Sequence, residues 1–260
     1  MSTGVERIAA AFAATDGHAA LMPYLMGGFP DLDASLAIGE AYADGGADLV
    51  ELGVPFSDPL ADGSVIHAAG TRALASGATV PAVIELARAL AERVPVVLMC
   101  YSNLILARGV ERFADELASA GVSGLIIPDL PLEESAAACE ACDAAGLALV
   151  PLVAPTTPED RLAQICPQAR GFIYTVSVTG TTGERTELDP GALLARVQAH
   201  ARVPVALGFG IATPEQAAAA AAAGADGVIV GSRLVRAAAE GEDVRALVAE
   251  LSAALRGAAH

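Results

Sequence analysis

The 260-residue sequence predicts an α/β fold: a single (β/α)8 TIM barrel over residues 1–260, with an extra N-terminal helix and extra helices after strands 2 and 8. Eight short apolar segments alternate with segments of helical periodicity, and no two of them are joined by a hairpin turn. Strands that are apolar throughout are typical of a parallel sheet covered by helices. Arg-Val-Pro-Val also leads into both the third and the seventh strand, a repeat at an offset of half a barrel.

Capping residues and glycines mark the expected elements of the first half of the chain. Asp31 or Asp33 can cap a helix that ends before Gly45, and Thr79 before Pro81 starts another. We therefore expect a helix at 5–15, a strand from 21 that runs into a glycine turn at 27–28, a helix to about 42, a strand at 47–52, helices at 64–76 and 80–92, and a strand at 94–101.

The second half follows the same alternation. Gly121 and Gly146 end two helices, and Asp189-Pro190 is a strong helix start, because an aspartate N-cap precedes a proline in the first turn. The expected order is a helix at 108–119, a strand at 124–129, a helix at 132–145, a strand at 147–152, a short helix from 157, a strand at 171–176, a loop at 177–188, a helix at 189–200, a strand at 203–207, a helix from 213, a strand at 228–230 and terminal helices after 232.

The composition excludes several classes of function. A net charge of −16 argues against binding to nucleic acid or to anionic membranes. No stretch resembles a signal peptide or a membrane span, and four cysteines suit a reducing compartment, so we expect a cytoplasmic protein. Cys139 and Cys142 form one Cys-x-x-Cys pair in a helical, alanine-rich stretch, and without a second pair this favours a structural role.

The basic residues narrow the chemistry further. All 15 are arginine, and the absence of lysine excludes a Schiff base on this chain, including covalently bound pyridoxal phosphate. The four histidines are scattered without metal-ligand spacing, so we expect no metal site.

Two carboxylates stand out in the stretch from Asp48 to Gly63. Glu51 interrupts an otherwise apolar strand, where an unused charge costs several kcal/mol of desolvation, and Asp62 follows in the next loop. Glu51 is either a functional group or half of a structural ion pair. In a barrel of this type the active site lies at the C-terminal ends of the strands, which is where both residues are expected.

Glycines after the last strands predict a phosphate site. Gly183, Gly210 and Gly231 allow close approach of backbone N–H groups, and Ser232 adds a hydroxyl at a helix N-terminus, where the helix dipole favours an anion. The alternative is that these glycines only form tight turns. The polar, glycine-containing loop 177–188 suits a lid that closes over a ligand, although an ordinary mobile loop has the same composition.

Aromatic residues near strand ends suggest an apolar slot. Tyr101, Tyr174 and Phe209 could enclose a flat substrate, whereas Tyr24 is nearer the core and His67 is expected at the surface or at a helix cap. Two carboxylates beside a phosphate site predict acid–base chemistry on a phosphorylated, partly aromatic metabolite. Without lysine or metal ligands, the substrate itself must accept the electrons of any carbon–carbon cleavage, as an indole ring protonated at C3 would.

The stretch Glu51-Leu-Gly-Val-Pro-Phe-Ser-Asp-Pro-Leu-Ala-Asp-Gly63 resembles the signature segment of the tryptophan synthase alpha chain family. The resemblance extends over nearly the whole chain. It includes Pro23-Tyr24 with Gly28 and Pro30, Tyr101 to Leu104, Ile126 to Pro131, Pro151-Leu152, Ala154 to Thr157, Phe172 to Tyr174, Thr182-Gly183, Gly208 to Ile211 and Gly231-Ser232.

This resemblance implies retro-aldol cleavage of indole-3-glycerol phosphate to indole and D-glyceraldehyde 3-phosphate. It implies that Glu51 is the main acid/base and that Asp62 polarises the indole N–H. The other implied roles are substrate binding by Tyr24, Tyr101, Tyr174, Thr182 and Phe209, and phosphate binding by Gly183, Gly210, Gly231 and Ser232.

The resemblance also implies a partner. Members of the family pass indole through a tunnel to a beta chain, expected in an alpha2beta2 complex, and the 54–61 loop lies near that interface. The implied cofactor, pyridoxal phosphate, belongs to the beta chain, so we expect none on this chain. Rival hypotheses are a stand-alone indole-3-glycerol-phosphate lyase and a non-catalytic barrel that binds a phospho-ligand and stimulates a partner.

The sequence departs from the family pattern at several positions. Met26-Gly27 precedes Gly28 where many members have a threonine and an apolar residue, Phe29 replaces a common aspartate before Pro30, and His67 occupies a position often held by glutamine. The lid sequence 179–183 also differs from the usual form. These departures bear on the pocket and the lid, not on the two carboxylates.

Overall fold

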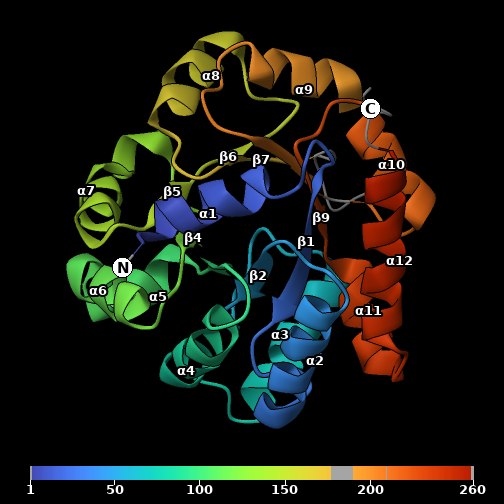
Figure 1. Cartoon of the computed structure of the whole chain (residues 1–260). Helices are drawn as coiled ribbons and strands as arrows, with labels where there is room; N and C mark the ends of the chain where they lie inside the picture. The colour runs from blue at the N-terminus through green and yellow to red at the C-terminus, as the bar shows by residue number, and fades with distance from the viewer. Residues whose placement is uncertain (1, 177–189, 209, 259–260) are drawn as a thin grey trace.

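The computed structural model describes residues 2–176, 190–208 and 210–258. Figure 1 shows helices arranged around a central ring of strands. The described strands are all parallel and form one sheet in the order β5-β4-β3-β2-β1-β9-β8-β7-β6. They are β1 (Ala20–Met26), β2 (Val50–Gly53), β3 (Val96–Met99), β4 (Gly124–Ile126), β5 (Ala148–Val150), β6 (Leu152–Val153), β7 (Ile173–Val176), β8 (Val205–Gly208) and β9 (Gly227–Val230).

The ring is closed at Pro151, which lies inside the fifth of the eight predicted barrel strands. The single strand expected at 147–152 is divided there, so that nine strands are described instead of eight. Its first part, β5, pairs with β4, and its second part, β6, pairs with β7. The Tyr174 amide donates to the Pro151 carbonyl at 3.0 Å, while proline has no N–H to continue the ladder. The chain therefore changes neighbours at this residue and joins the two edges of the sheet.

The helices surround the ring, except that α1 lies across its N-terminal end (Figure 1). They are α1 (Gly4–Ala13), α2 (Leu32–Asp44), α3 (Ser64–Ala75), α4 (Val80–Ala91), α5 (Ser102–Arg108), α6 (Val110–Ser119), α7 (Ala136–Ala145), α8 (Glu159–Ile165), α9 (Pro190–Gln198), α10 (Pro214–Ala222), α11 (Ser232–Glu240) and α12 (Val244–Gly257), with short 3-10 turns η1 (Leu132–Glu134) and η2 (Cys166–Gln168). The extra helices predicted at the N-terminus, after strand 2 and after strand 8 are α1, the α3–α4 pair and the α11–α12 pair.

Local capping explains several of these boundaries. Asp31, not Asp33, caps α2 by accepting from the Ala34 amide at 2.9 Å, and Thr79 caps α4 as expected. One helix was not predicted: α5 starts directly after Tyr101, because Asp129 accepts from the Ser102 amide and hydroxyl at 2.9 and 2.7 Å. A carboxylate from the next strand end thus supplies the cap, and local sequence does not reveal it.

The N-terminal end of the ring is covered by α1, which lies across it in Figure 1. Ile8 is fully buried among the side chains inside the barrel, and the Phe12 ring lies 5.9 Å from that of Phe172 on the chain entering β7. The α1 backbone is fastened by the Gly4 amide, which donates to the Gly146 carbonyl at 2.8 Å. The interior is therefore filled from this end.

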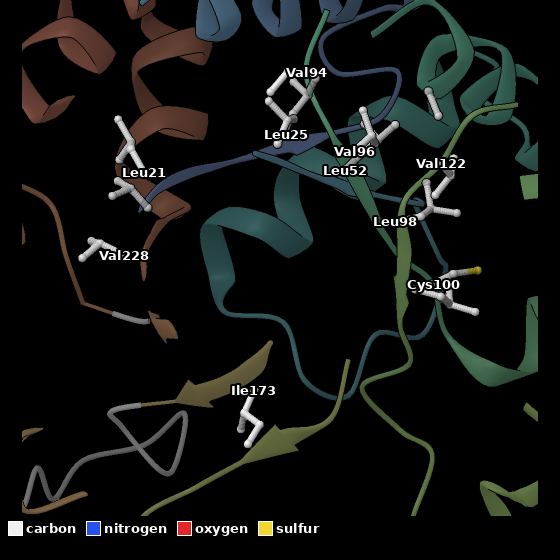
Figure 2. Close-up of a cluster of buried hydrophobic side chains, with 14 of the residues drawn as sticks. Leu21, Leu25, Leu52, Val94, Val96, Leu98, Cys100, Val122, Ile173 and Val228 are labelled. Carbon is white, nitrogen blue, oxygen red and sulfur yellow. The ribbon is translucent and has the colours of Figure 1, made fainter. Parts of the chain in front are cut away.

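Two apolar layers hold the barrel together. Side chains such as Met22, Val97 and Ile229 fill the interior, while their strand neighbours point outward to the helices. Figure 2 shows part of the outer layer, with Leu21, Leu25, Leu52, Val94, Val96, Leu98, Cys100, Val122, Ile173 and Val228 as labelled sticks. Burial of both strand faces accounts for the almost continuous apolar runs in the sequence.

Within the described ranges, no single helix is long and apolar enough to cross a membrane. In the part of the chain that the structure describes, one pair of helices, α3 and α4, passes that test of length and composition when taken together, and the two helices are bent by 108° relative to each other.

Candidate active site

Glu51 lies on β2, opposite Tyr24 of β1 on one side and Val97 of β3 on the other. Its side chain is 2% exposed and lines a cavity of about 610 Å³. Neither carboxylate oxygen has a hydrogen-bond partner among the described residues, which argues against the alternative of a structural ion pair. A buried carboxyl group without a partner is a candidate for chemistry.

The surroundings of Glu51 favour its neutral form. Burial, and secondarily the nearby charge of Asp62, raise the pKa of Glu51 from 4.5 to about 8. At neutral pH the group is therefore mainly a carboxylic acid that can donate a proton. Burial in the apolar strand makes the larger contribution to this shift, and the carboxylate in the following loop adds to it.

Asp62 lines the same cavity from the loop between β2 and α3. The Tyr101 hydroxyl donates to Asp62 Oδ1 at 2.9 Å and accepts from the Ala61 amide at 3.0 Å, so that one oxygen holds both the side chain and the loop backbone. Burial raises the pKa of Asp62, and the Tyr101 hydrogen bond and the charge of His67 oppose that rise. The surroundings of Asp62 therefore stabilise its ionised form more than the surroundings of Glu51 stabilise the ionised form of Glu51.

Tyr101 has a different position from the other predicted substrate-binding tyrosines. Its ring stacks on Phe56 with 5.2 Å between the ring centroids, and it contacts Asp62 instead of lining the cavity. His67 is exposed on α3, in agreement with the surface position expected for it.

Tyr24 and Tyr174 line the cavity from β1 and β7, and each leans over a glycine of the neighbouring strand. A Cβ atom on Gly53 would lie 2.0 Å from the Tyr24 hydroxyl oxygen, and one on Gly208 would lie 2.5 Å from that of Tyr174. These glycines make room for the two rings. Burial raises the pKa of both tyrosines, and the nearby carboxyl groups, Asp62 and then Glu51 for Tyr24 and Glu51 for Tyr174, raise it further, so both remain neutral phenols.

The last strands contribute the other side of the cavity. Gly210, Gly231 and Ser232 line it, with Gly210 at φ +81° and Gly231 directly before α11. The free N–H groups of the first turn of α11 are available to an anion there. The predicted residues Thr182, Gly183 and Phe209, and the 177–188 loop, lie outside the described residues.

Sequence reasoning missed part of the lining. Arg233 and Arg236 of α11 border the cavity beside Ser232; Arg233 directly follows that serine and Arg236 lies one turn farther along the helix, and this spacing was the available indication. Apolar walls come from Met99, Pro128, Leu152 and Ile229 at the ends of other strands. The cavity therefore combines apolar walls, two carboxylates on the β2 side and a helix N-terminus with arginines on the β9 side.

Beyond Pro128 and Leu152, which line both spaces, lies a second cavity of about 370 Å³ between the β4 end, α7 and α8. Its lining includes Cys139 but no carboxylate, so it lacks the acid–base groups of the first. All four cysteines are free, and the described part of the chain contains no cluster of His, Cys, Asp and Glu residues suited to a metal ion.

Comparison with known proteins identifies the family. The model of the family described as tryptophan synthase alpha chain matches residues 11–259. The tryptophan synthase alpha chain of Methanosarcina mazei is 50% identical over 239 residues, covering 91% of this chain and 88% of that protein. In a structure of Mycobacterium tuberculosis tryptophan synthase, a chain 39% identical superposes with a TM-score of 0.91, covering 98% of this chain and 99% of its own length.

A third similar protein comes from a structure of the tryptophan synthase α2β2 complex of Pyrococcus furiosus. Its matching chain is 35% identical, with a TM-score of 0.81 and coverage of 91% of this chain and 97% of its own length. The agreement spans sequence and fold over nearly the full length in each case. The chain belongs to the tryptophan synthase alpha chain family.

Proposed function

We propose that this chain carries out the alpha reaction of its family with Glu51 and Asp62 as the catalytic residues. The reaction is the retro-aldol cleavage of indole-3-glycerol phosphate to indole and D-glyceraldehyde 3-phosphate, a carbon–carbon lyase step. The observation that supports the assignment best is Glu51 itself: it is buried, has no hydrogen-bond partner among the described residues, and faces the cavity that Asp62 and the α11 N-terminus also line.

In the proposed first step, the neutral Glu51 carboxyl group protonates C3 of the indole ring. The ring becomes positively charged, and Asp62 stabilises that charge by accepting a hydrogen bond from the indole N–H. The geometry supports this division of roles, because burial favours the protonated form of Glu51 while the Tyr101 hydroxyl favours the ionised form of Asp62.

In the second step, the carboxylate left on Glu51 accepts the proton of the hydroxyl group on the carbon attached to C3. The bond between that carbon and C3 breaks, its electron pair returns to the ring, and the carbon becomes the aldehyde of glyceraldehyde 3-phosphate. One proton has moved from the hydroxyl to C3, and Glu51 is protonated again. Neither a metal nor a covalent intermediate enters this sequence of steps.

The remaining assignments concern substrate binding. Tyr24 and Tyr174 would hold the indole against the apolar walls, and Gly210, Gly231 and Ser232 would hold the phosphate at the N-terminus of α11. Tyr101 would act through Asp62. Thr182, Gly183 and Phe209 keep their roles as predictions from the family resemblance alone.

Membership of the family implies a beta-chain partner, and we propose an alpha2beta2 complex with pyridoxal phosphate on the beta chain. The Pyrococcus furiosus complex supports this assembly for a similar chain. On this chain, Leu60 is 86% exposed and Leu106 is 66% exposed, in the loop after β2 and in α5 after β3. Two large exposed apolar side chains beyond neighbouring strand ends are consistent with a partner surface at the mouth of the barrel.

The test is release of indole from indole-3-glycerol phosphate by the isolated chain, with and without a tryptophan synthase beta chain. We expect slow release alone and faster release in the complex. High activity alone, unchanged by the beta chain, would favour a stand-alone lyase. Stimulation of the beta chain's own activity without any release of indole would favour a non-catalytic barrel. No release of indole, with or without the beta chain, would contradict both enzyme hypotheses.

A further inference from the structure

The two sides of the active-site cavity differ in charge. Glu51 and Asp62 line it from β2 and the loop that follows, whereas the side formed by β9 and α11 presents Ser232, Arg233 and Arg236. The whole chain carries a net charge of −16, so a phosphorylated substrate approaches a protein of its own sign. Local positive charge inside the cavity mouth therefore has a clear use.

Helix geometry brings Arg236 close to the proposed phosphate position. Ser232 is the first residue of α11, and Arg236 follows four residues later, so the two lie on the same face of the helix. Their separation along the axis is about 6 Å. Helical side chains lean toward the N-terminus, and a long arginine side chain spans such a distance. Both residues line the same cavity, as this geometry requires.

The two arginines differ in how free their charge is. Arg233 is held by Glu242, with guanidinium nitrogens 2.7 and 3.0 Å from its two carboxylate oxygens. Arg236 has no carboxylate partner among the described residues and is exposed at the cavity. Of the two cations beside Ser232, only Arg236 can therefore offer its guanidinium to a ligand without breaking an ion pair.

We propose that Arg236 is a phosphate-binding residue, whose guanidinium donates hydrogen bonds to the oxygens of the phosphate held at the N-terminus of α11. This inference rests on the proposed function and adds to it a charged side chain that recognises the dianion. Backbone N–H groups and the Ser232 hydroxyl accept any anion of suitable shape. A guanidinium adds preference for a doubly charged phosphate through paired, charge-assisted hydrogen bonds.

The experiment compares Arg236→Met, which keeps the length of the side chain but removes its charge, with Arg236→Lys, which keeps the charge. Arg245→Met is the matched control, because Arg245 is exposed on α12, does not line the cavity, and changes the net charge equally. Three quantities are measured: kcat and KM for indole-3-glycerol phosphate, the Kd of glycerol 3-phosphate, and the Kd of indole.

For Arg236→Met we expect KM and the Kd of glycerol 3-phosphate to rise roughly 3- to 10-fold at low salt, the range for a charge-assisted contact that stays partly exposed. The value of kcat and the Kd of indole should stay close to those of the unmodified chain, since neither involves the phosphate directly. Arg236→Lys should recover part of the loss. The difference should shrink at high ionic strength, because salt screens exposed charges.

Several results would overturn the proposal. One is an Arg236→Met variant that matches Arg245→Met in every measured quantity. Another is a loss of indole affinity as large as the loss of glycerol 3-phosphate affinity, which indicates a structural role. The third is a fall in kcat at constant KM. Binding of glycerol 3-phosphate is measured without turnover. If the unmodified chain does not cleave indole-3-glycerol phosphate, the proposed function fails, while the comparison of glycerol 3-phosphate affinities still decides the role of Arg236.

Discussion

The Tyr101 hydroxyl donates a 2.9 Å hydrogen bond to Asp62 and accepts one from the Ala61 amide, so the end of β3 positions the loop that follows β2. The carboxylate in that loop takes part in raising the pKa of Glu51. A residue outside the cavity lining thus influences the proton affinity of the group inside it, and the first prediction follows from this connection.

Tyr101→Phe should lower kcat/KM about tenfold, because Asp62 loses the donor that orients it. Removal of a hydrogen bond that lowers the pKa of Asp62 should also move the acidic limb of the pH–rate profile upward. Phe56→Leu is the control, since it removes the ring stacked on Tyr101 and keeps the hydroxyl group. A Tyr101→Phe profile identical to that of the unmodified chain would show that Asp62 does not need this contact.

The pH dependence should report Glu51. The group acts as an acid and its pKa is raised to about 8, so the active form is present below that pH and is lost above it. We expect kcat/KM to fall roughly tenfold per pH unit above about pH 8. Steady-state rates between pH 6 and 10, with circular dichroism to verify folding, measure this. A constant kcat/KM up to pH 10 is incompatible with Glu51 as the proton donor.

Glu51→Gln should abolish turnover and stabilise the fold at alkaline pH. The carboxyl group ionises at about 4.5 when unfolded and about 8 when folded, so unfolding releases a proton between these values and stability declines as pH rises through them. Glutamine does not titrate. Its advantage in unfolding free energy should grow from pH 5 to pH 8.5, by at most on the order of 5 kcal/mol. Urea unfolding at the two pH values measures it, and parallel stability curves for the two proteins would refute the raised pKa.

Gly53→Ala should destabilise the protein by roughly 1–3 kcal/mol, because the new methyl group overlaps the buried Tyr24 ring. Displacement of Tyr24 should also raise KM, since its ring lines the cavity. Gly63→Ala provides the comparison: among the described residues other than its chain neighbours, no atom would lie within 4 Å of a Cβ atom added there, and its φ of −70° suits alanine. Thermal unfolding of both variants is the measurement, and equal melting temperatures would contradict the role assigned to Gly53.

Leu60→Asp should weaken beta-chain binding roughly 10- to 100-fold, the effect of losing an apolar contact worth about 1–3 kcal/mol. The isolated chain should keep its stability, because Leu60 is 86% exposed. Leu74→Asp changes a less exposed leucine near the far end of α3 and should leave complex formation intact. Titration with a beta chain, followed by sedimentation or by stimulation of indole release, distinguishes them. Unchanged affinity for Leu60→Asp would remove this loop from the partner surface.

Much of the fold could be predicted from the sequence, because the barrel leaves a strong pattern. Strands buried on both faces are continuously apolar, and helix caps such as Asp31 and Thr79 act over a few residues. The break at Pro151 and the start of α5 were missed, since each depends on a partner from another strand: Tyr174 in one case and Asp129 in the other.

The candidate site was predictable to a different degree. A carboxylate in an apolar strand was visible as an exception, and the structure places Glu51 in the same cavity as Asp62, Gly231 and Ser232. The hydrogen bond between Tyr101 and Asp62 joins residues 39 positions apart, and no local sequence pattern predicts it. The predictions that the chain forms a single domain and that the protein lies in the cytoplasm remain predictions.

The position of α1 across the N-terminal end of the barrel has a consequence for how substrate enters and products leave. Ile8 is buried inside the barrel and Phe12 packs against Phe172, so side chains fill the N-terminal end, while the cavity lies at the opposite end of the described strands. We therefore expect the substrate to enter, and both products to leave, through the loops at the C-terminal ends of the strands. Whatever docks on those loops controls the order of entry and exit, and can receive the uncharged fragment before it reaches bulk water.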